Sequence, residues 1–108
     1  MNWKVPLFMP DFTEEDEQQA CQPIREGWLT MGERTQAFEE TFARQLPIRH
    51  AIAVANGTAA LHLALACADV SPGDEVLVPS LTFVACANTI LTLGARPVFV
   101  DCISEDDW

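Results

Sequence analysis

The residues in this chain best suited to chemistry lie where an apolar segment is interrupted by three small polar residues. The stretch VANGTAALHLALA (residues 54–66) stops at Asn56-Gly57-Thr58 and then continues as an almost purely Ala/Leu segment. A helix that starts here after a strand presents unpaired backbone N–H groups and a partial positive charge. Gly57 leaves room for an anion, Thr58 adds a hydroxyl donor and Asn56 can cap the helix. The pattern fits a phosphate site or a plain cap and turn, and it is neither a GxGxxG motif nor a P-loop.

Segments on both sides of this site alternate between strand and helix patterns. Short apolar runs at 51–55, 75–79 and 97–101 predict strands, whereas 58–68 and 82–93 predict helices. The helix over 58–68 is apolar nearly all round, which predicts that it is buried. On the later helix, one apolar stripe is expected, formed by Phe83, Val84, Ala87, Ile90 and Leu91. This order predicts an α/β fold with three mostly parallel strands.

Two further helices are expected before the first predicted strand. Thr13 is the expected cap of a helix with an acidic first turn, and Pro23 is expected to kink or break it. Another helix is expected from Glu33 and is stopped by Pro47, after the connecting loop GWLTMG (27–32).

Composition excludes several classes of function. The chain has 108 residues, the size of one ordinary domain, and sixteen acidic against six basic residues give a net charge of −10. This charge argues against nucleic acid or an anionic membrane as a partner. Neither a membrane-spanning run nor a signal peptide is evident. The four cysteines lack metal-ligand spacing and are expected to be buried free thiols in a reducing cytoplasm, with no metal site.

Three segments together resemble one known family. GWLTMG, AVANGTAALHLAL and PGDEVLVPSLTFVACANTILTLGARPVFVD resemble the opening third of the DegT/DnrJ/StrS family of sugar-nucleotide aminotransferases, from about Pro10 to Asp101. The resemblance implies a pyridoxal 5′-phosphate enzyme of the aspartate-aminotransferase type (fold type I). It also implies an N-terminal arm over 1–12 and, over 13–108, the first part of the cofactor-binding large domain, with an incomplete sheet. The full enzyme would be a cytoplasmic homodimer that moves an amino group from glutamate or glutamine to a nucleotide-linked keto sugar.

The resemblance also implies roles for individual residues in the cofactor site. Gly57, Thr58 and Ala59 would bind the cofactor phosphate, chiefly through backbone N–H groups and the Thr58 hydroxyl. Phe83 would lie against the face of the pyridine ring, with a plain core aromatic as the alternative.

Other positions that match the family carry less specific expectations. Thr30 and Gly32 would border the substrate site near the subunit boundary, or would simply form a loop. Asn88 and Asp101 are interpreted as structural, and His62 as a core histidine with its hydrogen bonds satisfied.

Catalysis by such an enzyme needs groups that this sequence does not supply. Lys4 is the only lysine, and it lies outside every motif. In the family, the lysine that holds the cofactor and the acid on the pyridine nitrogen lie downstream of the PVFVD strand. We therefore assign no catalytic residue and expect the chain alone to be inactive, marginally stable, and a fragment or partner-dependent. The alternatives are a sugar dehydratase of the same family, with histidine in place of the lysine, and a truncated, non-catalytic remnant or binding module. An unrelated Rossmann-like nucleotide binder is disfavoured because no strand is followed by a glycine fingerprint.

Overall fold

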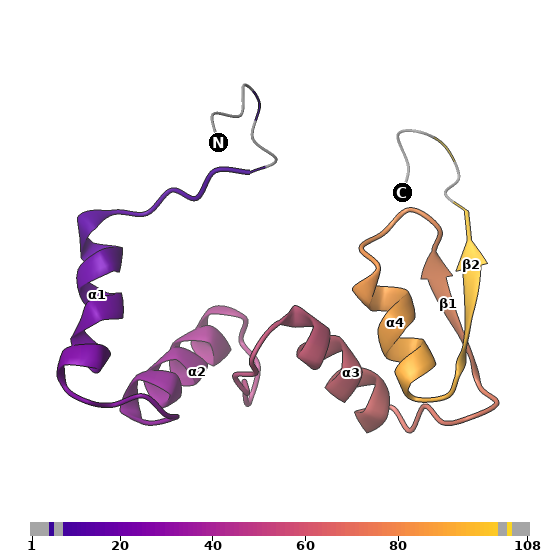
Figure 1. Ribbon diagram of the computed structural model, residues 1–108. Coiled ribbons are helices and arrows are strands. Elements are labelled where there is room, and N and C mark those ends of the chain that lie inside the picture. Colours follow the sequence, from indigo (N-terminus) through magenta and orange to yellow (C-terminus); the bar gives the residue numbers. More distant parts are fainter. Residues whose placement is uncertain (1–4, 6–7, 102–103, 105–108) are drawn as a thin grey trace. The chain divides into compact units, whose positions relative to one another are not determined.

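The computed structural model describes residue 5, residues 8–101 and residue 104 (Figure 1). Its elements in chain order are α1 (Glu14–Arg25), α2 (Glu33–Gln45), α3 (Gly57–Cys67), β1 (Glu75–Pro79), α4 (Ala85–Thr92) and β2 (Arg96–Val100). The α/β class is confirmed, and every predicted helix is found close to its predicted place. Within the described part of the chain, no helix is long and apolar enough to cross a membrane.

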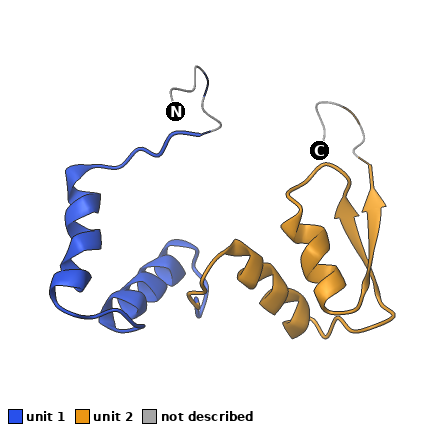
Figure 2. Cartoon of the chain, viewed as in Figure 1, with its two compact units in different colours: residues 1–51 blue, residues 52–108 orange. Residues whose placement is uncertain are grey.

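The chain divides into two compact units, residues 1–51 and residues 52–108 (Figure 2). The first unit contains α1 and α2, and the second contains α3, α4 and both strands. No residue of α1 or α2 is buried, so the first unit has no core of its own within these helices. The assignment of an arm over 1–12 and a single large domain over 13–108 stays a prediction.

Helix α1 begins at a capping box. The Thr13 hydroxyl accepts the Asp16 N–H at 3.3 Å, and the Asp16 carboxylate accepts the Thr13 N–H at 2.8 Å. The backbone hydrogen bond from Thr13, and then the one from its hydroxyl, hold the pKa of Asp16 below its ordinary value. The predicted break at Pro23 is wrong, because the helix continues through this residue and ends at Arg25. Pro23 lies in the last turn of α1, where the loss of its N–H disrupts little of the helix's hydrogen bonding.

The second unit is built on a short parallel sheet with α4 as the crossover helix. Strands β1 and β2 pair in parallel, with Glu75 opposite Arg96 and Pro79 opposite Val100. A Schellman motif ends α4: Gly94 has φ 77°, and the Ala95 N–H donates to the Ile90 carbonyl at 3.2 Å. The glycine returns the chain to the sheet directly after the helix.

The sheet has two strands in the described part of the chain, not the predicted three. The two C-terminal strands are found where expected, but residues 51–55 form no strand. A β-strand requires a neighbouring strand, and the two that are present pair with each other.

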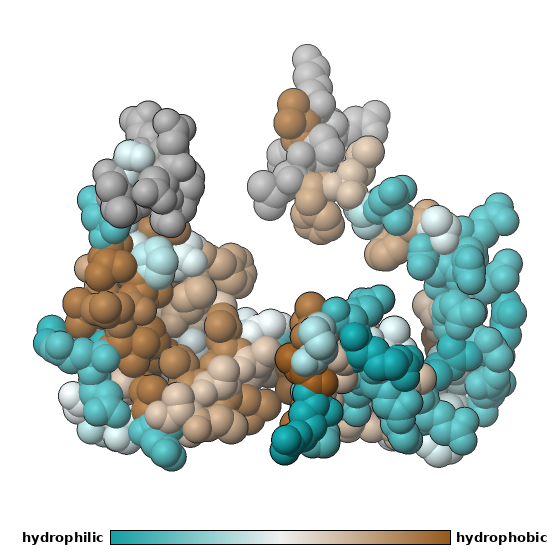
Figure 3. Space-filling view, turned by 180° about the vertical axis from the view of Figure 1, so that it is seen from behind, coloured by the Kyte–Doolittle hydropathy of each residue, from teal (hydrophilic) through white to brown (hydrophobic). Residues whose placement is uncertain are grey.

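The core of the second unit is small. Val78, Ile90 and Ala95 are buried together, and Leu65 of α3 packs against them. The prediction that α3 is buried is wrong: none of its residues is buried, and Leu63 is 48% exposed. In Figure 3 hydrophobic residues gather on this unit, whereas α1 is predominantly hydrophilic. The apolar composition of α3 therefore marks a helix that its own chain covers only in part.

The buried face of α4 also differs from the predicted stripe. The helix starts at Ala85, so Phe83 precedes it, and Leu91 is 57% exposed. Its buried residues are Ala85, Thr89 and Ile90. Thr89 is only 3% exposed, and its hydroxyl donates to the Ala85 carbonyl at 2.9 Å, which satisfies this buried donor inside the unit.

Two of the cysteines that were expected to be buried are exposed. Cys21 on α1 and Cys67 at the end of α3 are free and exposed, whereas Cys86 is free and half-buried. Cys102 lies outside the described residues.

Candidate functional site

The start of α3 is the centre of the candidate site. Asn56 has extended backbone (φ −168°, ψ 172°) and acts as the N-cap, its Oδ1 accepting the Ala59 N–H at 2.9 Å. The capping role predicted for Asn56 is confirmed. This hydrogen bond engages the Ala59 N–H. Of the three backbone N–H groups expected to bind the phosphate, those of Gly57 and Thr58 therefore remain as candidates.

Those two amides belong to Gly57 and Thr58. Within the described part of the chain, neither N–H donates to a protein acceptor, and the Thr58 hydroxyl makes no protein hydrogen bond. Both residues are exposed. Two unpaired amides and a hydroxyl at the positive end of a helix dipole are suited to an anion.

Space around Gly57 is the second feature that fits an incoming group. A Cβ placed on this residue would meet no atom of the described residues within 4 Å. The backbone of Gly57 is not in the left-handed region either, so neither conformation nor packing in this chain requires glycine. Because Gly57 has no side chain, a group can approach the Gly57 and Thr58 amides without obstruction.

A groove of about 570 Å³ runs from this helix start along the gap between α3 and α4. It is lined by Asn56, Thr58, Ala59, His62, Leu63, Asn88, Thr89 and Thr92. Not one of these residues is a carboxylate or a permanent cation, so an anion here would depend on amides, hydroxyls and the helix dipole. Sequence reasoning missed the groove, although the four-residue step from Thr58 to His62 on one helix face could have indicated it.

His62 belongs to this groove and not to a core. It is half-buried, and its ring makes no hydrogen bond to any residue that the structure describes. The interpretation as a satisfied core histidine is therefore wrong. Asn88, also interpreted as structural, lies on the opposite wall, where its carbonyl accepts the Thr92 hydroxyl at 2.8 Å.

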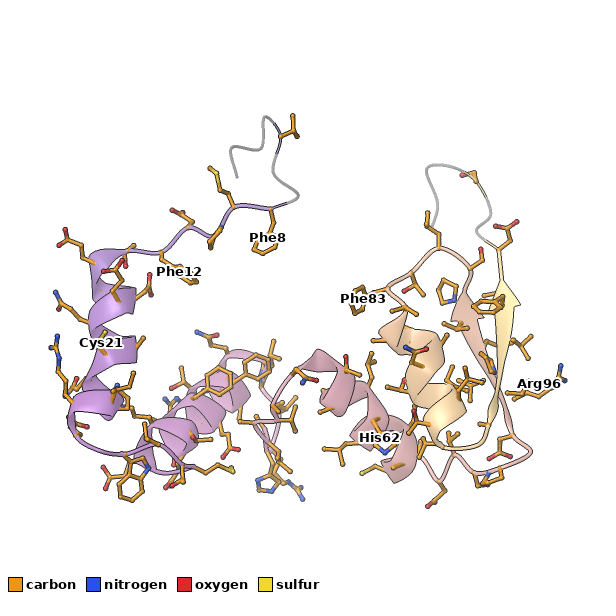
Figure 4. All side chains as sticks on the ribbon, in the orientation of Figure 1. Phe8, Phe12, Cys21, His62, Phe83 and Arg96 are labelled. Carbon is orange, nitrogen blue, oxygen red and sulfur yellow. The ribbon has the colours of Figure 1, made fainter. Side chains whose placement is uncertain are left out.

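Phe83 stands in the loop before α4 and is 75% exposed. Its ring projects away from the strands (Figure 4). A core aromatic would be buried, so that alternative does not describe Phe83 in this chain. An exposed ring in the same unit as the α3 start remains available to stack on a flat group, and the stacking role stays a prediction.

Thr30 and Gly32, the predicted substrate residues, lie in the unit of residues 1–51. Thr30 is exposed in the loop. Gly32 is the N-cap of α2, and a Cβ on it would lie 2.7 Å from Cε2 and 2.8 Å from Cζ2 of the Trp28 indole. Gly32 therefore has a packing role, and its substrate role stays a prediction.

The residues of the α3 start fit the phosphate group of the implied cofactor. They supply two unpaired amides, a hydroxyl and open space, which are the elements of a phosphate cradle. No group of three His, Cys, Asp or Glu side chains among the described residues could hold a metal ion. Lys4, the only lysine, lies outside the described residues.

An α/β chain with unpaired amides at a helix start and an exposed aromatic in the same compact unit has features that fit a phosphate-bearing cofactor. The family comparison agrees: the profile of the DegT/DnrJ/EryC1/StrS aminotransferase family matches residues 10–108, and the chain belongs to this family.

Curated relatives are sugar-biosynthesis proteins. The chain is 40% identical over 102 residues to the UDP-4-amino-4-deoxy-L-arabinose–oxoglutarate aminotransferase of Shewanella sediminis, covering 94% of this chain and 26% of the relative. It is 43% identical over 100 residues to the spore coat polysaccharide biosynthesis protein SpsC of Bacillus subtilis, covering 93% and 26%. It is 40% identical over 102 residues to the GDP-perosamine synthase of Escherichia coli O157:H7, covering 94% and 28%. The chain thus spans about a quarter of the length of these relatives.

Solved structures confirm the fold and the family's cofactor. A putative sugar aminotransferase from Streptococcus pneumoniae, solved in a PLP-form and a PMP-form, superposes with a TM-score of 0.85 at 35% identity, over 96% of this chain and 26% of that chain. An aminotransferase from Psychrobacter cryohalolentis superposes with a TM-score of 0.81 at 35% identity, over 86% and 24%. The described elements are therefore part of an aminotransferase fold of type I, and pyridoxal phosphate is the cofactor of the family.

Proposed function

We propose that this chain is the N-terminal part of a pyridoxal-phosphate-dependent sugar aminotransferase, in which residues 13–108 form part of the cofactor-binding domain. The observation that carries the proposal is the open start of α3, where Gly57 and Thr58 offer amides that no described residue uses. Family membership over residues 10–108 supports pyridoxal phosphate as the ligand of this site. The enzyme would transfer an amino group from glutamate or glutamine to a nucleotide-linked keto sugar, a substrate class that the names of two relatives support.

Each residue of the cradle has a distinct task. Gly57 and Thr58 bind the phosphate through their amides, and the Thr58 hydroxyl adds a third donor. Phe83 lies against one face of the cofactor ring and fixes its tilt. When bound, the cofactor supplies a pyridine ring that withdraws electrons from the substrate. No residue of this chain is assigned the proton transfer.

The remaining properties of the enzyme follow from charge and family. A net charge of −10 disfavours nucleic acid and anionic membranes as partners. A cytoplasmic homodimer is proposed for the full-length enzyme. Thr30 and Gly32 are proposed to border its substrate site.

The cradle is tested by following the amide signals of the ¹⁵N-labelled chain by NMR during titration with two probes. Pyridoxine 5′-phosphate carries the ring and the phosphate but no aldehyde that would react with Lys4, and inorganic phosphate carries the anion alone. We expect both probes to shift the Gly57 and Thr58 signals saturably. Thr58→Ala should weaken the binding of both probes about tenfold, since a hydrogen bond to a charged group, worth about 1.5 kcal/mol, is lost. Thr41→Ala, a matched change on exposed α2, should leave both affinities unchanged.

Phe83→Ala separates the ring from the phosphate. We expect the affinity for pyridoxine 5′-phosphate to fall about fivefold, because the loss of stacking costs about 1 kcal/mol, while inorganic phosphate binds as before. Shifts that saturate at other residues, or no shifts in a chain whose circular dichroism shows its helices intact, would contradict the proposed cradle.

A further inference from the structure

One titratable side chain beside the phosphate cradle has no part in the proposal above. His62 on α3 lines the groove between α3 and α4, is half-buried, and makes no hydrogen bond to any residue that the structure describes. An imidazole always carries at least one ring N–H donor, and its charge changes between about pH 5 and 8. The groove therefore contains a donor that can also become a cation.

His62 lies one helical turn beyond Thr58 on the same face of α3. Four residues advance an α-helix by about 6 Å, and helical side chains incline toward the N-terminus of their helix. The His62 side chain therefore covers the turn that begins at Thr58, and both residues line the same groove. This arrangement directs the imidazole toward the end of α3 where the Gly57 and Thr58 amides are unpaired.

The surroundings of His62 contain no competing charge. Within the described part of the chain, α4 is the element that packs against α3, and neither helix contains an Asp, Glu, Lys or Arg. Their other titratable side chains are the thiols of Cys67 and Cys86, which do not line the groove and are ordinarily neutral below about pH 8. Asp69 follows the far end of α3. The wall that faces α3 is uncharged and consists of Asn88, Thr89 and Thr92.

We infer that His62 gives this anion site a pH-dependent positive charge: when protonated, its imidazole stands beside the phosphate group held at the start of α3 and strengthens its binding. The inference rests on the proposed function, because it takes the anion to lie at the Gly57 and Thr58 amides. It adds a binding residue outside the Asn56–Ala59 turn. Amides and a hydroxyl donate at any pH, whereas the imidazole contributes charge only when protonated, so the affinity should rise as the pH falls.

Sulfate is the probe for this inference, because it remains a dianion throughout the range in which an imidazole changes its charge. The Gly57 and Thr58 amide signals and the His62 ring signals are followed by NMR while the full chain is titrated with sulfate. Titrations at about pH 8 and about pH 5.5 share one ionic strength, so that screening is equal. We expect the affinity read from the amides to be about tenfold higher at the lower pH, and the His62 ring signals to follow the same saturation curve.

Three variants separate the charge of His62 from its shape. His62→Gln keeps a helix-favouring side chain with an N–H donor but cannot become charged, so its affinity should change little with pH. His62→Lys is a cation at both pH values and should bind sulfate at about pH 8 as tightly as the wild type does at about pH 5.5. His50→Gln, at the other histidine of the chain, is the matched control and should retain the wild-type increase. Circular dichroism at both pH values checks that the helices of each variant are intact.

The inference is overturned if the increase in affinity survives in His62→Gln, or if His62→Lys binds no more tightly than His62→Gln at the higher pH. It is also overturned if the His62 ring signals stay unchanged while the amides saturate. In each of these cases the saturable response of Gly57 and Thr58 would leave the phosphate cradle standing. Absence of an amide response at both pH values would contradict the cradle and, with it, the role of His62.

Discussion

Two helices have a glycine at their N-terminal end, Gly32 as the N-cap of α2 and Gly57 as the first residue of α3, and the surroundings of the two glycines are opposite. Gly32 caps α2 with no side-chain hydrogen bond, and the Trp28 indole occupies the space where its side chain would be. Gly57 is the first residue of α3 and follows the N-cap Asn56, and no atom of the described residues lies within 4 Å of the place where its Cβ would be. The first glycine serves the packing of its own chain, whereas the second serves no contact that the chain itself makes.

Both glycines are explained by their surroundings and not by their backbone conformation. Neither residue has a positive φ, so neither is explained by left-handed backbone. At Gly32 the explanation is a neighbouring ring. Glycine at position 57 lowers the helix propensity of α3, and the described residues leave the space beside it unfilled. This is expected of a residue that makes room for a ligand.

The largest effect is expected from removing the core that holds α3 and α4 together. Ile90 is 3% exposed and packs with Val78, Ala95 and Leu65. Ile90→Ala should lower the free energy of unfolding of residues 52–108 by about 3 kcal/mol, through lost burial and a cavity. Hydrogen exchange followed by NMR should show lost protection in α4 and unchanged exchange in α2. Equal losses in both units would show that they fold as one, and would remove the basis for comparing their helix starts separately.

Exchanging the glycines for valine tests the comparison directly. Gly57→Val should weaken inorganic phosphate binding by about 2 kcal/mol, roughly thirtyfold, because the branched side chain blocks the approach to two amides. Gly32→Val should leave phosphate affinity unchanged and should instead displace Trp28, seen as a change in its fluorescence in the W3F/W108F variant, in which Trp28 is the only tryptophan. The comparison is wrong if phosphate affinity falls equally in both variants.

Local signals in the sequence were sufficient for much of this fold. The strand over 75–79 lies between a turn and a proline and was predicted with its observed bounds. The start of α3 was evident because Asn-Gly-Thr is both a good cap and a change of pattern. In each case the determining residues are neighbours in sequence, so no distant contact is needed.

The errors concern features that depend on distant residues. Apolar character all round α3 predicts burial, but burial requires other elements to cover the helix, and Leu63 remains 48% exposed. The segment 51–55 has the composition of a strand but not a place in the described sheet. Phe83 continues the apolar period of the next helix, which concealed the loop that leaves its ring exposed.

A smaller effect is expected from giving the Asn56 cap a charge. Asn56→Asp keeps a good N-cap and adds a negative charge at the positive end of α3. The free energy of unfolding should therefore rise by about 0.5 kcal/mol. The same charge lies beside the proposed phosphate site and should weaken inorganic phosphate binding about fivefold, or about 1 kcal/mol. Thermal unfolding and phosphate titration of the same sample measure both. Improved phosphate binding by the aspartate variant would place the anion elsewhere.

The smallest effect concerns the start of α1, where a capping box is present and no glycine stands at the helix start. Its hydrogen bonds lower the pKa of Asp16 from its ordinary value of 3.8, so the unfolded chain takes up this proton at higher pH than the folded one. The stabilisation of α1 by Asp16 should thus be complete above about pH 3.8 and should be lost as the pH falls through the lowered value.

Amide exchange of the first turn of α1, compared between wild type and Asp16→Asn, measures this pH dependence. Protection in the wild type should decline toward that of Asp16→Asn on acidification, and the two should differ most near neutral pH. The control is the start of α3, where the Asn56 amide does not titrate and the cap hydrogen bond should persist through the same range. A parallel decline at both helix starts would mean that acid acts through the fold as a whole, and the distinction between a titrating cap and a neutral one would not hold.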